Sequence, residues 1–276
     1  MKTKTEETPS IKIYSEDDFK GLKKAGSLAA RTLEYIEKLI KPGVKTNFID
    51  EAANKFLNDH GAFSAPLFYR GYTKSICTSI NHVVCHGIPS DQTLKEGDII
   101  NIDITSILNG YYGDTSKTFS VGNVSIEAKK LIQVTYESMM EGIKILKPGI
   151  TLGDIGFAIQ EHTEKKNGYG VVRELVGHGL GTELHEDPQV PNYGKRGTGM
   201  KLVENLVLAI EPMINLGTHK VFTEEDGWTV KTQDGKVSVH FEHDVCVKKN
   251  EALILSDFSI IEAAEKANIN LNSSYY

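Results

Sequence analysis

The sequence predicts an α+β fold, in which helices lie apart from a mostly antiparallel sheet. Segments with a helical spacing of apolar residues lie between runs in which apolar and polar residues alternate, as they do in strands. An Asn109-Gly110 pair indicates a tight hairpin between two of these runs. The chain also repeats part of itself weakly, which favours two related halves.

Four segments have the helical pattern. The first ends before Pro42-Gly43, and the fourth has Asp154 at the position of a capping box and runs to about Asn167. Each begins at a residue that can cap a helix, and the four caps are Ser15, Thr46, Ser125 and Thr151. Strand patterns fill the intervals, near residues 72–85, 98–108, 111–121, 171–177, 205–214, 218–223, 227–233 and 237–248.

The Asn109-Gly110 hairpin places two aspartates on one face of the sheet. Polar side chains alternate with isoleucines over residues 99–105, so Asp103 and Thr105 share a face. If Asn109-Gly110 forms the turn, Thr105 pairs with Asp114, and Asp103 and Asp114 become diagonal neighbours with Cβ atoms about 7–8 Å apart. That separation suits two carboxylates that reach shared cations. A solvated polar face of a hairpin is the alternative.

Two more acids and a histidine occupy comparable positions. Glu242 lies on the polar face of the alternating run 239–247, and Glu211 follows the run 206–210, which is apolar on both faces. A carboxylate there is rarely buried without a partner, and a salt-bridged core acid is the alternative. Glycines on both sides of His178 permit close approach of a metal or substrate, and we expect the Gly-rich stretch 177–188 to be a flexible turn.

Convergence of these residues would require a counter-charge. Two unit negative charges about 4 Å apart repel by about 4 kcal/mol at an effective dielectric of about 20. Two divalent cations would balance four carboxylates, and oxygen-rich sites with one imidazole suit Mn²⁺, Fe²⁺, Co²⁺ or Zn²⁺. The candidate ligands are Asp103, Asp114, His178, Glu211 and Glu242.

The internal repeat relates the first acid to the fourth. The segment that ends at Asp103 matches the segment that ends at Glu211, 108 residues later, and Lys41-Pro42-Gly43-Val44 recurs 106 residues later as Lys147-Pro148-Gly149-Ile150. This period is far too long for a solenoid. Two pseudo-symmetric halves, about 15–124 and 125–260, could each contribute an acid to one central site.

The composition is that of a globular enzyme. Of 276 residues, 39% are hydrophobic and 25% charged. The net charge of −6 disfavours general nucleic-acid binding, and no apolar run is long enough to span a membrane. A polar N-terminus without an apolar core and only three cysteines favour the cytoplasm. We expect a polar extension over residues 1–14, one catalytic domain over 15–260 and a polar tail over 261–276.

A series of short motifs resembles the type I methionine aminopeptidases in order and spacing, from about Ser15 to Ser256. The motifs are Cys85-His86-Gly87-Ile88-Pro89, Asn101-Ile102-Asp103, Gly113-Asp114-Thr115, Gly177-His178-Gly179, Ile210-Glu211-Pro212 and Glu242-His243. The resemblance implies the pita-bread fold, with two pseudo-symmetric halves around a curved antiparallel sheet and helices on its outer face.

The resemblance also implies two divalent metal ions per chain, of Co, Mn, Fe, Zn or Ni. Asp103 would hold one metal, Asp114 and Glu242 would bridge both, and His178 and Glu211 would complete the second site. Glu211 would also serve as the general acid and base.

The remaining implied roles concern the substrate. His185 would hydrogen-bond the substrate carbonyl or its oxyanion, and His86 would contact the scissile amide nitrogen or the tetrahedral intermediate. Leu184 stands where many relatives carry Phe in the wall of the methionine pocket. The side chains expected to hold methionine, for which ordinary packing is the alternative, are Tyr69, Tyr72, Cys77 and Trp228. We expect ordinary structural roles for the other histidines, His60, His82, His162, His219, His240 and His243.

The activity implied is removal of the N-terminal methionine from peptides and nascent chains with a small second residue, by a cytoplasmic monomer. Ribosome association is left open. A proline-directed aminopeptidase or dipeptidase of the same fold is one alternative, although such enzymes usually carry a large domain before the catalytic one. A catalytically inactive peptide-binding module is the other, although such proteins lose metal ligands and this chain retains all five.

Overall fold

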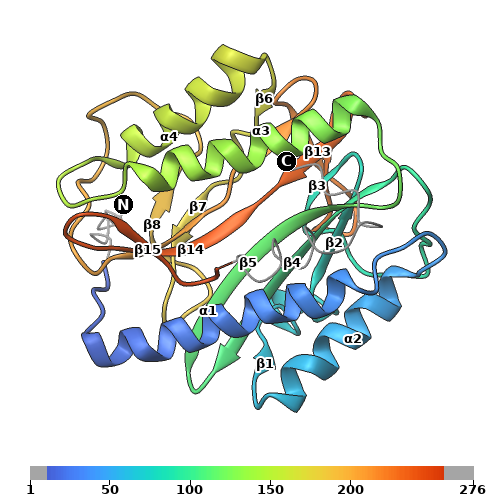
Figure 1. Cartoon of the computed structure of the whole chain (residues 1–276), viewed down its shortest axis with the longest axis horizontal. Helices are drawn as coiled ribbons and strands as arrows, with labels where there is room; N and C mark the ends of the chain where they lie inside the picture. The colour runs from blue at the N-terminus through green and yellow to red at the C-terminus, as the bar shows by residue number, and fades with distance from the viewer. Residues whose placement is uncertain (1–10, 258–276) are drawn as a thin grey trace, which may run out of the picture.

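The computed structural model of the protein describes residues 11–257. Figure 1 shows α1 and α2 over the part of the main sheet that contains β4 and β5, and α3 and α4 over the part that contains β7 and β8. The pairings between strands are antiparallel, so the predicted α+β class is confirmed. The helices are α1 (Glu16–Glu37), α2 (Thr46–Asp59), α3 (Ile126–Lys144) and α4 (Leu152–Gln160), with a 3₁₀ turn at Tyr69–Gly71 and a π-helical turn at Glu161–Lys165.

The main sheet has nine strands in the order β1-β4-β5-β14-β9-β7-β8, with β2 paired to β4 and β15 paired to β14. Two three-stranded sheets, β13-β10-β6 and β11-β12-β3, flank it. The strands are β1 (Phe63–Ser64), β2 (Cys77–Ile80), β3 (Val83–Cys85), β4 (Ile99–Leu108), β5 (Tyr111–Ser120), β6 (Gly170–Val171), β7 (Gly177–Gly179), β8 (Glu186–Val190), β9 (Val207–Ile210), β10 (Met213–Asn215), β11 (Val221–Thr223), β12 (Val230–Thr232), β13 (Ser238–His240), β14 (Glu242–Val247) and β15 (Ala252–Ile254).

Three of the four predicted helix caps are confirmed. Ser15 and Thr151 form capping boxes with an aspartate three residues on, and Ser125 accepts a hydrogen bond from the first turn of α3. The prediction for Thr46 was wrong, because α2 begins at Thr46 itself. Its hydroxyl instead bonds the backbone of Ser90, accepting the N–H at 2.8 Å and donating to the carbonyl at 3.1 Å.

The internal repeat is present in the backbone hydrogen bonds. Gly43 and Gly149 both have left-handed φ angles, of 91° and 93°. The N–H of Gly43 donates to the carbonyl of Leu94 at 2.8 Å, and the N–H of Gly149 donates to the carbonyl of Leu202 at 2.9 Å. Equivalent turns therefore precede α2 and α4, and each is bonded to the segment that leads toward an acid of the predicted site.

Several predicted strands are divided. The segment 205–214 forms β9 and β10, because Pro212 has no N–H to donate to a ladder. The segment 237–248 forms β13 and β14, which pair with different neighbours, β10 and β5. The strand pattern at 72–85 also divides, at Asn81, whose φ of 54° is left-handed.

The expectation of a flexible turn over residues 177–188 was wrong at both ends of that stretch. Residues 177–179 form β7, and β8 begins at Glu186 and pairs with it. The two glycines of β7 allow neighbouring backbone to approach closely. A Cβ at Gly177 would lie 2.3 Å from the carbonyl oxygen of Ala209, and one at Gly179 would lie 2.2 Å from that of Asp187. Only residues 180–185 lie outside the two strands.

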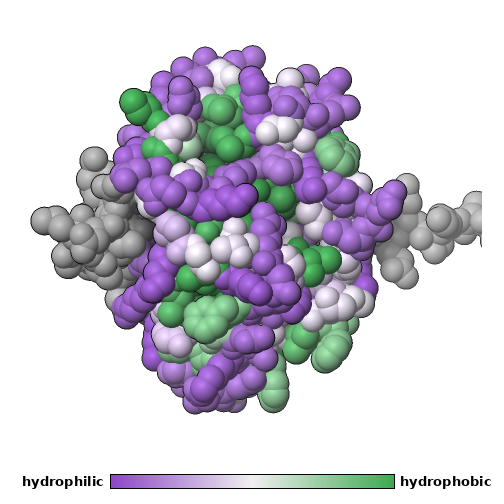
Figure 2. Space-filling view, turned by 90° about the vertical axis from the view of Figure 1, so that its right-hand side faces the viewer, coloured by the Kyte–Doolittle hydropathy of each residue, from purple (hydrophilic) through white to green (hydrophobic). Residues whose placement is uncertain are grey.

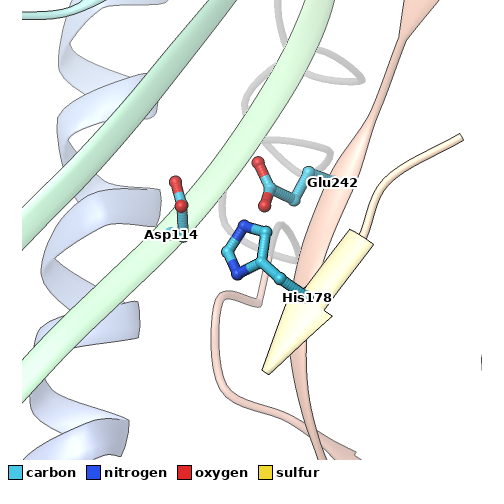
Figure 3. A group of neighbouring side chains, drawn as sticks. All are labelled: Asp114, His178 and Glu242. Atoms are coloured by element: carbon cyan, nitrogen blue, oxygen red, sulfur yellow. The ribbon is translucent and has the colours of Figure 1, made fainter. Parts of the chain in front are cut away.

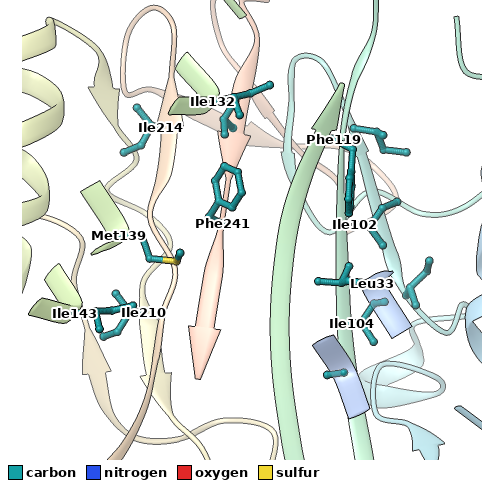
Figure 4. Close-up of a cluster of buried hydrophobic side chains, with 14 of the residues drawn as sticks. Leu33, Ile102, Ile104, Phe119, Ile132, Met139, Ile143, Ile210, Ile214 and Phe241 are labelled. Atoms are coloured by element: carbon teal, nitrogen blue, oxygen red, sulfur yellow. The ribbon is translucent and has the colours of Figure 1, made fainter. Parts of the chain in front are cut away.

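The core lies between the helices and the sheet, where burial of apolar side chains supplies the main favourable free energy of folding. Figure 4 shows Met139 and Ile143 of α3 facing Ile210, with Leu33 of α1 near Ile104 on the other half. Figure 2 shows apolar side chains on one end of the molecule as separate patches among polar ones. Across residues 11–257, no helix is long and apolar enough to cross a membrane.

Candidate metal centre and substrate cavity

The β4–β5 hairpin places two aspartates as the turn geometry predicts. Thr105 pairs with Asp114, and Asp103 pairs with Ser116. The hydroxyl of Thr105 donates a hydrogen bond of 2.8 Å to Oδ1 of Asp114, which orients that buried carboxylate. The two acids therefore share one face of the hairpin, and this face lines a cavity instead of meeting open solvent.

Three candidate ligands from three strands converge. Asp114 comes from β5, Glu242 from β14, which pairs with β5 at Ser116, and His178 from β7. One ligand atom from each lies within 4.8 Å of the others, and all three residues are buried. Figure 3 shows the imidazole and the two carboxylates pointing toward one another. Glu211 follows β9, and its Oε1 lies 3.3 Å from Nε2 of His178.

The tautomer of His178 indicates what this cluster can hold. Its Nδ1 lies 2.9 Å from the carbonyl oxygen of Gly179, an acceptor only, so Nδ1 carries the proton and donates it. In the neutral ring Nε2 then presents a lone pair toward the carboxylate oxygens of Asp114, Glu211 and Glu242. Lone pairs directed at one another repel, whereas a cation between them is bound by all. The residues present therefore fit a divalent cation site.

The pKa shifts of the cluster have the same cause. Burial, reinforced by neighbouring acids, raises the pKa of Asp103, Glu211 and Glu242 well above the ordinary values. Burial lowers the pKa of His178 to about 3, so the imidazole is neutral and available as a ligand. Cations would offset the cost of holding these carboxylates ionised together.

A cavity of about 480 Å³ opens over the acids, and every residue that the sequence analysis placed at the site lines it. These residues are Tyr69, Tyr72, Cys77, His86, Asp103, Asp114, His178, His185, Glu211, Trp228 and Glu242. Leu184, the expected pocket-wall position, also lines the cavity. Lining residues that sequence reasoning missed are Pro66, Arg70, Cys85, Thr105, Leu175, Val176, Met213 and Gly227.

One end of the cavity is aromatic. The ring of Trp228 meets the ring of Tyr72 edge to face at 5.1 Å and that of His86 at 6.3 Å. The hydroxyl of Tyr72 lies 3.1 Å from the carbonyl oxygen of Gly87, so it bonds the turn that carries His86. His86 has a left-handed φ of 55°, a backbone strain that is concentrated at functional sites. Burial lowers its pKa to about 4.

His185 lies beside the candidate ligands. Its ring lies 4.5 Å from that of His178, and its Nδ1 lies 3.0 Å from the hydroxyl of Tyr69. Burial and the charge of Arg70 lower its pKa, which favours the neutral ring. Neutral His86 and His185 can each offer an N–H to a substrate without adding a cation to the site.

Two further residues of the segment 239–247 lie beside the ligands. Nε2 of His240 lies 3.7 Å from Oε2 of Glu211, although we expected an ordinary structural role for this histidine. Oδ2 of Asp244 accepts the N–H of Asp114 at 2.5 Å. His240 and Asp244 share the polar face of this run with Glu242. The same alternation could therefore have identified them as neighbours of the ligands. The other five histidines expected to have ordinary roles do not line the cavity.

Comparisons with known proteins agree with this geometry. The sequence model that describes metallopeptidase family M24 matches residues 20–249 of this chain. A methionine aminopeptidase of Rickettsia prowazekii is 52% identical over 242 residues, which cover 87% of this chain and 93% of the relative. A methionine aminopeptidase of Escherichia coli K12 is 47% identical over 249 residues, covering 90% of this chain and 94% of the relative.

Solved structures support the same relationship. The crystal structure of the Rickettsia prowazekii methionine aminopeptidase superposes with a TM-score of 0.88 at 51% identity, over 90% of this chain and all of that one. A prolidase from Pyrococcus furiosus, 22% identical, matches with a TM-score of 0.72 over 89% of this chain and 65% of its own, which shows a shared fold alone. The expected pita-bread fold is confirmed, and the chain belongs to metallopeptidase family M24.

Proposed function

We propose that this protein is a methionine aminopeptidase, which removes the N-terminal methionine from peptides and nascent proteins whose second residue is small. The observation that carries the proposal is a set of three carboxylates and an imidazole, largely buried, that lines one cavity together with aromatic, uncharged side chains. Relatives about half identical along almost their whole length bear this name. We further propose that it acts as a monomer in the cytoplasm.

We propose that Asp103, Asp114, His178, Glu211 and Glu242 together hold two divalent cations. Support comes from the neutral imidazole of His178, whose lone pair faces three acids. Bound cations would polarise the scissile carbonyl and lower the pKa of a water molecule. Oxygen-rich donors with one imidazole suit Mn, Fe, Co, Zn or Ni, and the donor set does not discriminate among them.

The chain's own groups would then manage the proton and the substrate. In this proposal Glu211 accepts a proton from the attacking water and returns it to the departing amine, as a general base and then a general acid. His185 donates an N–H to the substrate carbonyl, and Tyr69 fixes its ring through the contact at Nδ1. His86, on the strained turn after β3, contacts the scissile nitrogen, which can accept an N–H only once attack makes the carbonyl carbon tetrahedral.

Selection of methionine would fall to the uncharged side chains of the cavity. Tyr72 and Trp228 offer aromatic faces and edges, against which a thioether sulfur is stabilised by about 0.3–1.5 kcal/mol. Tyr69 and Cys77 complete this wall. A long unbranched side chain fits this chemistry better than lysine or glutamate, which would be desolvated there without an opposite charge.

Three peptides distinguish the proposal from its alternatives. In the presence of Mn²⁺ or Co²⁺ we expect release of Met from Met-Gly-Met-Met, little release from Met-Leu-Met-Met, and none of Ala from Ala-Pro-Gly. A proline-directed peptidase would release Ala from Ala-Pro-Gly, and a binding module would cleave none of them. Release of Ala without release of Met would overturn the proposal, with the Glu211→Gln variant as a control for contaminating peptidases.

A further inference from the structure

The loop that presents His185 to the cavity has no regular structure of its own. This loop, here called the His185 loop, comprises residues 180–185 and joins β7 to β8. It places His185 with its ring 4.5 Å from that of His178 and also carries Leu184 of the cavity wall. Such placement requires anchors, because an unanchored loop samples many backbone conformations.

Glu186, the first residue of β8, anchors the His185 loop. Its Oε1 accepts the N–H of Thr182 at 2.9 Å and that of Glu183 at 3.0 Å, so the residue that follows the loop bonds the backbone of the loop itself. The side chain of Glu186 is only 4% exposed. A carboxylate this deeply buried requires several donors, and two backbone amides alone leave oxygen lone pairs for others.

Tyr14, which lies just before α1, supplies a further hydrogen-bond donor to Glu186. Its hydroxyl lies 2.7 and 2.8 Å from the two carboxylate oxygens of Glu186, which share its one proton. It also lies 3.0 Å from the backbone nitrogen of Thr182, whose N–H it shares as an acceptor with Oε1 of Glu186. Tyr14 is 8% exposed, and its ring lies so close to Gly181 that a Cβ there would be 2.0 Å away. One phenol therefore bonds Thr182 within the His185 loop and Glu186 directly after it, and it covers Gly181.

Lys12 balances the charge of this arrangement. Its Nζ lies 2.9 Å from Oε1 of Glu183, 3.0 Å from Oε1 of Glu186 and 3.2 Å from the hydroxyl of Thr182. These acids raise the pKa of Lys12, which keeps it protonated. Ser15, the cap of α1, fixes the other end of the segment.

We infer that residues 11–14 form a strap that positions His185 for catalysis, with Tyr14 acting through Glu186. Tyr14 does not line the cavity, so it is a positioning residue. The inference rests on the proposed aminopeptidase function. The strap reaches residues 168–174 positions away in sequence, so the segment before the first helix becomes part of the apparatus that sets the active-site geometry.

The test compares Tyr14→Phe with Tyr111→Phe. Tyr111 is a matched control, since its hydroxyl also donates to a carboxylate, Oδ1 of Asp18 at 2.8 Å, and it contacts the same small apolar cluster as Tyr14. We expect Tyr14→Phe to lower kcat on Met-Gly-Met-Met about 10-fold, within the roughly 10²-fold that a misplacement of about 1 Å can cause. Metal stoichiometry should not change, and Tyr111→Phe should retain the wild-type kcat.

A double-mutant cycle separates positioning from general stabilisation. In a His185→Ala background, Tyr14→Phe should cause no further loss of kcat, because its effect passes through His185. An additional 10-fold loss in that background, or a wild-type kcat for Tyr14→Phe alone, would overturn the inference.

A measurement that does not depend on enzymatic turnover tests the strap separately from the proposed aminopeptidase function. Hydrogen exchange of the Thr182 and Glu183 amides should be at least about 10-fold faster in Tyr14→Phe than in Tyr111→Phe. Unchanged exchange of both amides would refute the strap even in an active enzyme. Faster exchange in a protein that releases no methionine would support the strap and reject the aminopeptidase.

Discussion

Removal of metal is expected to make the stability of this protein fall as pH rises from 7 to 8. Burial raises the pKa of Asp103, Glu211 and Glu242 well above the ordinary values, so the folded metal-free chain retains protons that the unfolded chain releases near pH 4. A raised folded pKa gives stability that is complete below the unfolded pKa and is lost as pH rises toward the folded pKa. The free energy of unfolding of the metal-free protein therefore decreases as pH rises.

The interval from pH 7 to 8 separates the buried acids of the cluster from its histidines. Burial lowers the pKa of His178 and His240 to about 3 and that of His86 to about 4, so these rings are neutral in the fold. In the unfolded chain histidine has a pKa of about 6.5 and is mostly neutral at pH 7 and above, so these rings influence stability mainly at lower pH. Each acid that stays protonated in the fold lowers the free energy of unfolding by about 1.4 kcal/mol per pH unit.

Urea unfolding of chelator-treated protein at pH 7.0, 7.5 and 8.0 measures this slope. Two retained protons would remove about 3 kcal/mol over the interval, a large share of the roughly 5–15 kcal/mol of a typical domain. With Mn²⁺ present the slope should flatten or reverse, because ligands must release protons to bind metal. Glu242→Gln should reduce the metal-free slope by about 1.4 kcal/mol per pH unit. Metal-free stability that is constant or increases over this interval would refute the reasoning.

Four further substitutions test the site and the strands that carry it. Glu211→Gln preserves size but removes the base, so kcat should fall by at least about 10²-fold, and wild-type turnover in the metal-loaded variant would exclude the assigned role. His185→Ala should lower kcat and keep both metals, whereas His178→Ala should lose one; equal losses in calorimetric titration would contradict this division. Gly179→Ala would place a Cβ 2.2 Å from the carbonyl oxygen of Asp187, so we expect at least about 1–3 kcal/mol of destabilisation in urea, and an unchanged midpoint would show that β7 and β8 can separate.

The first ligand pair was predictable because a tight turn fixes strand register. Asn109 and Gly110 both have left-handed φ angles, 53° and 84°, which a two-residue hairpin turn of this type requires. Once the turn is located, the pairing of Thr105 with Asp114 follows by counting, and so does the shared face of the two aspartates. The register of this hairpin is determined by residues close together in the sequence, so it could be predicted from the sequence alone.

Changes of partner along a strand could not be predicted in the same way. Alternation over residues 239–247 correctly places Glu242 on a polar face, but it does not show that β13 and β14 are separate strands with different neighbours. The place of His240 beside Glu211 depends on those partners. The contact of Tyr14 with Glu186 depends on residues 172 positions apart, with no local signal in either segment.

The ligand set weakens the sheet that carries it, and this explains why metal should stabilise the fold as well as supply chemistry. Strand β5 belongs to the first half of the chain and β14 to the second, and their register extends only over Glu242–Ser116 and His243–Thr115. At the next position the N–H of Asp114 donates to the side chain of Asp244 and not to a ladder carbonyl, which brings a further buried acid to the same seam. Without cations these acids stay together by retaining protons, and each deprotonation as pH rises adds a negative charge that opposes the contact between the halves. Cations held by Asp114, Glu242 and His178 would instead join β5, β14 and β7, and they would add about 2.7 kcal/mol at a free concentration 100 times Kd.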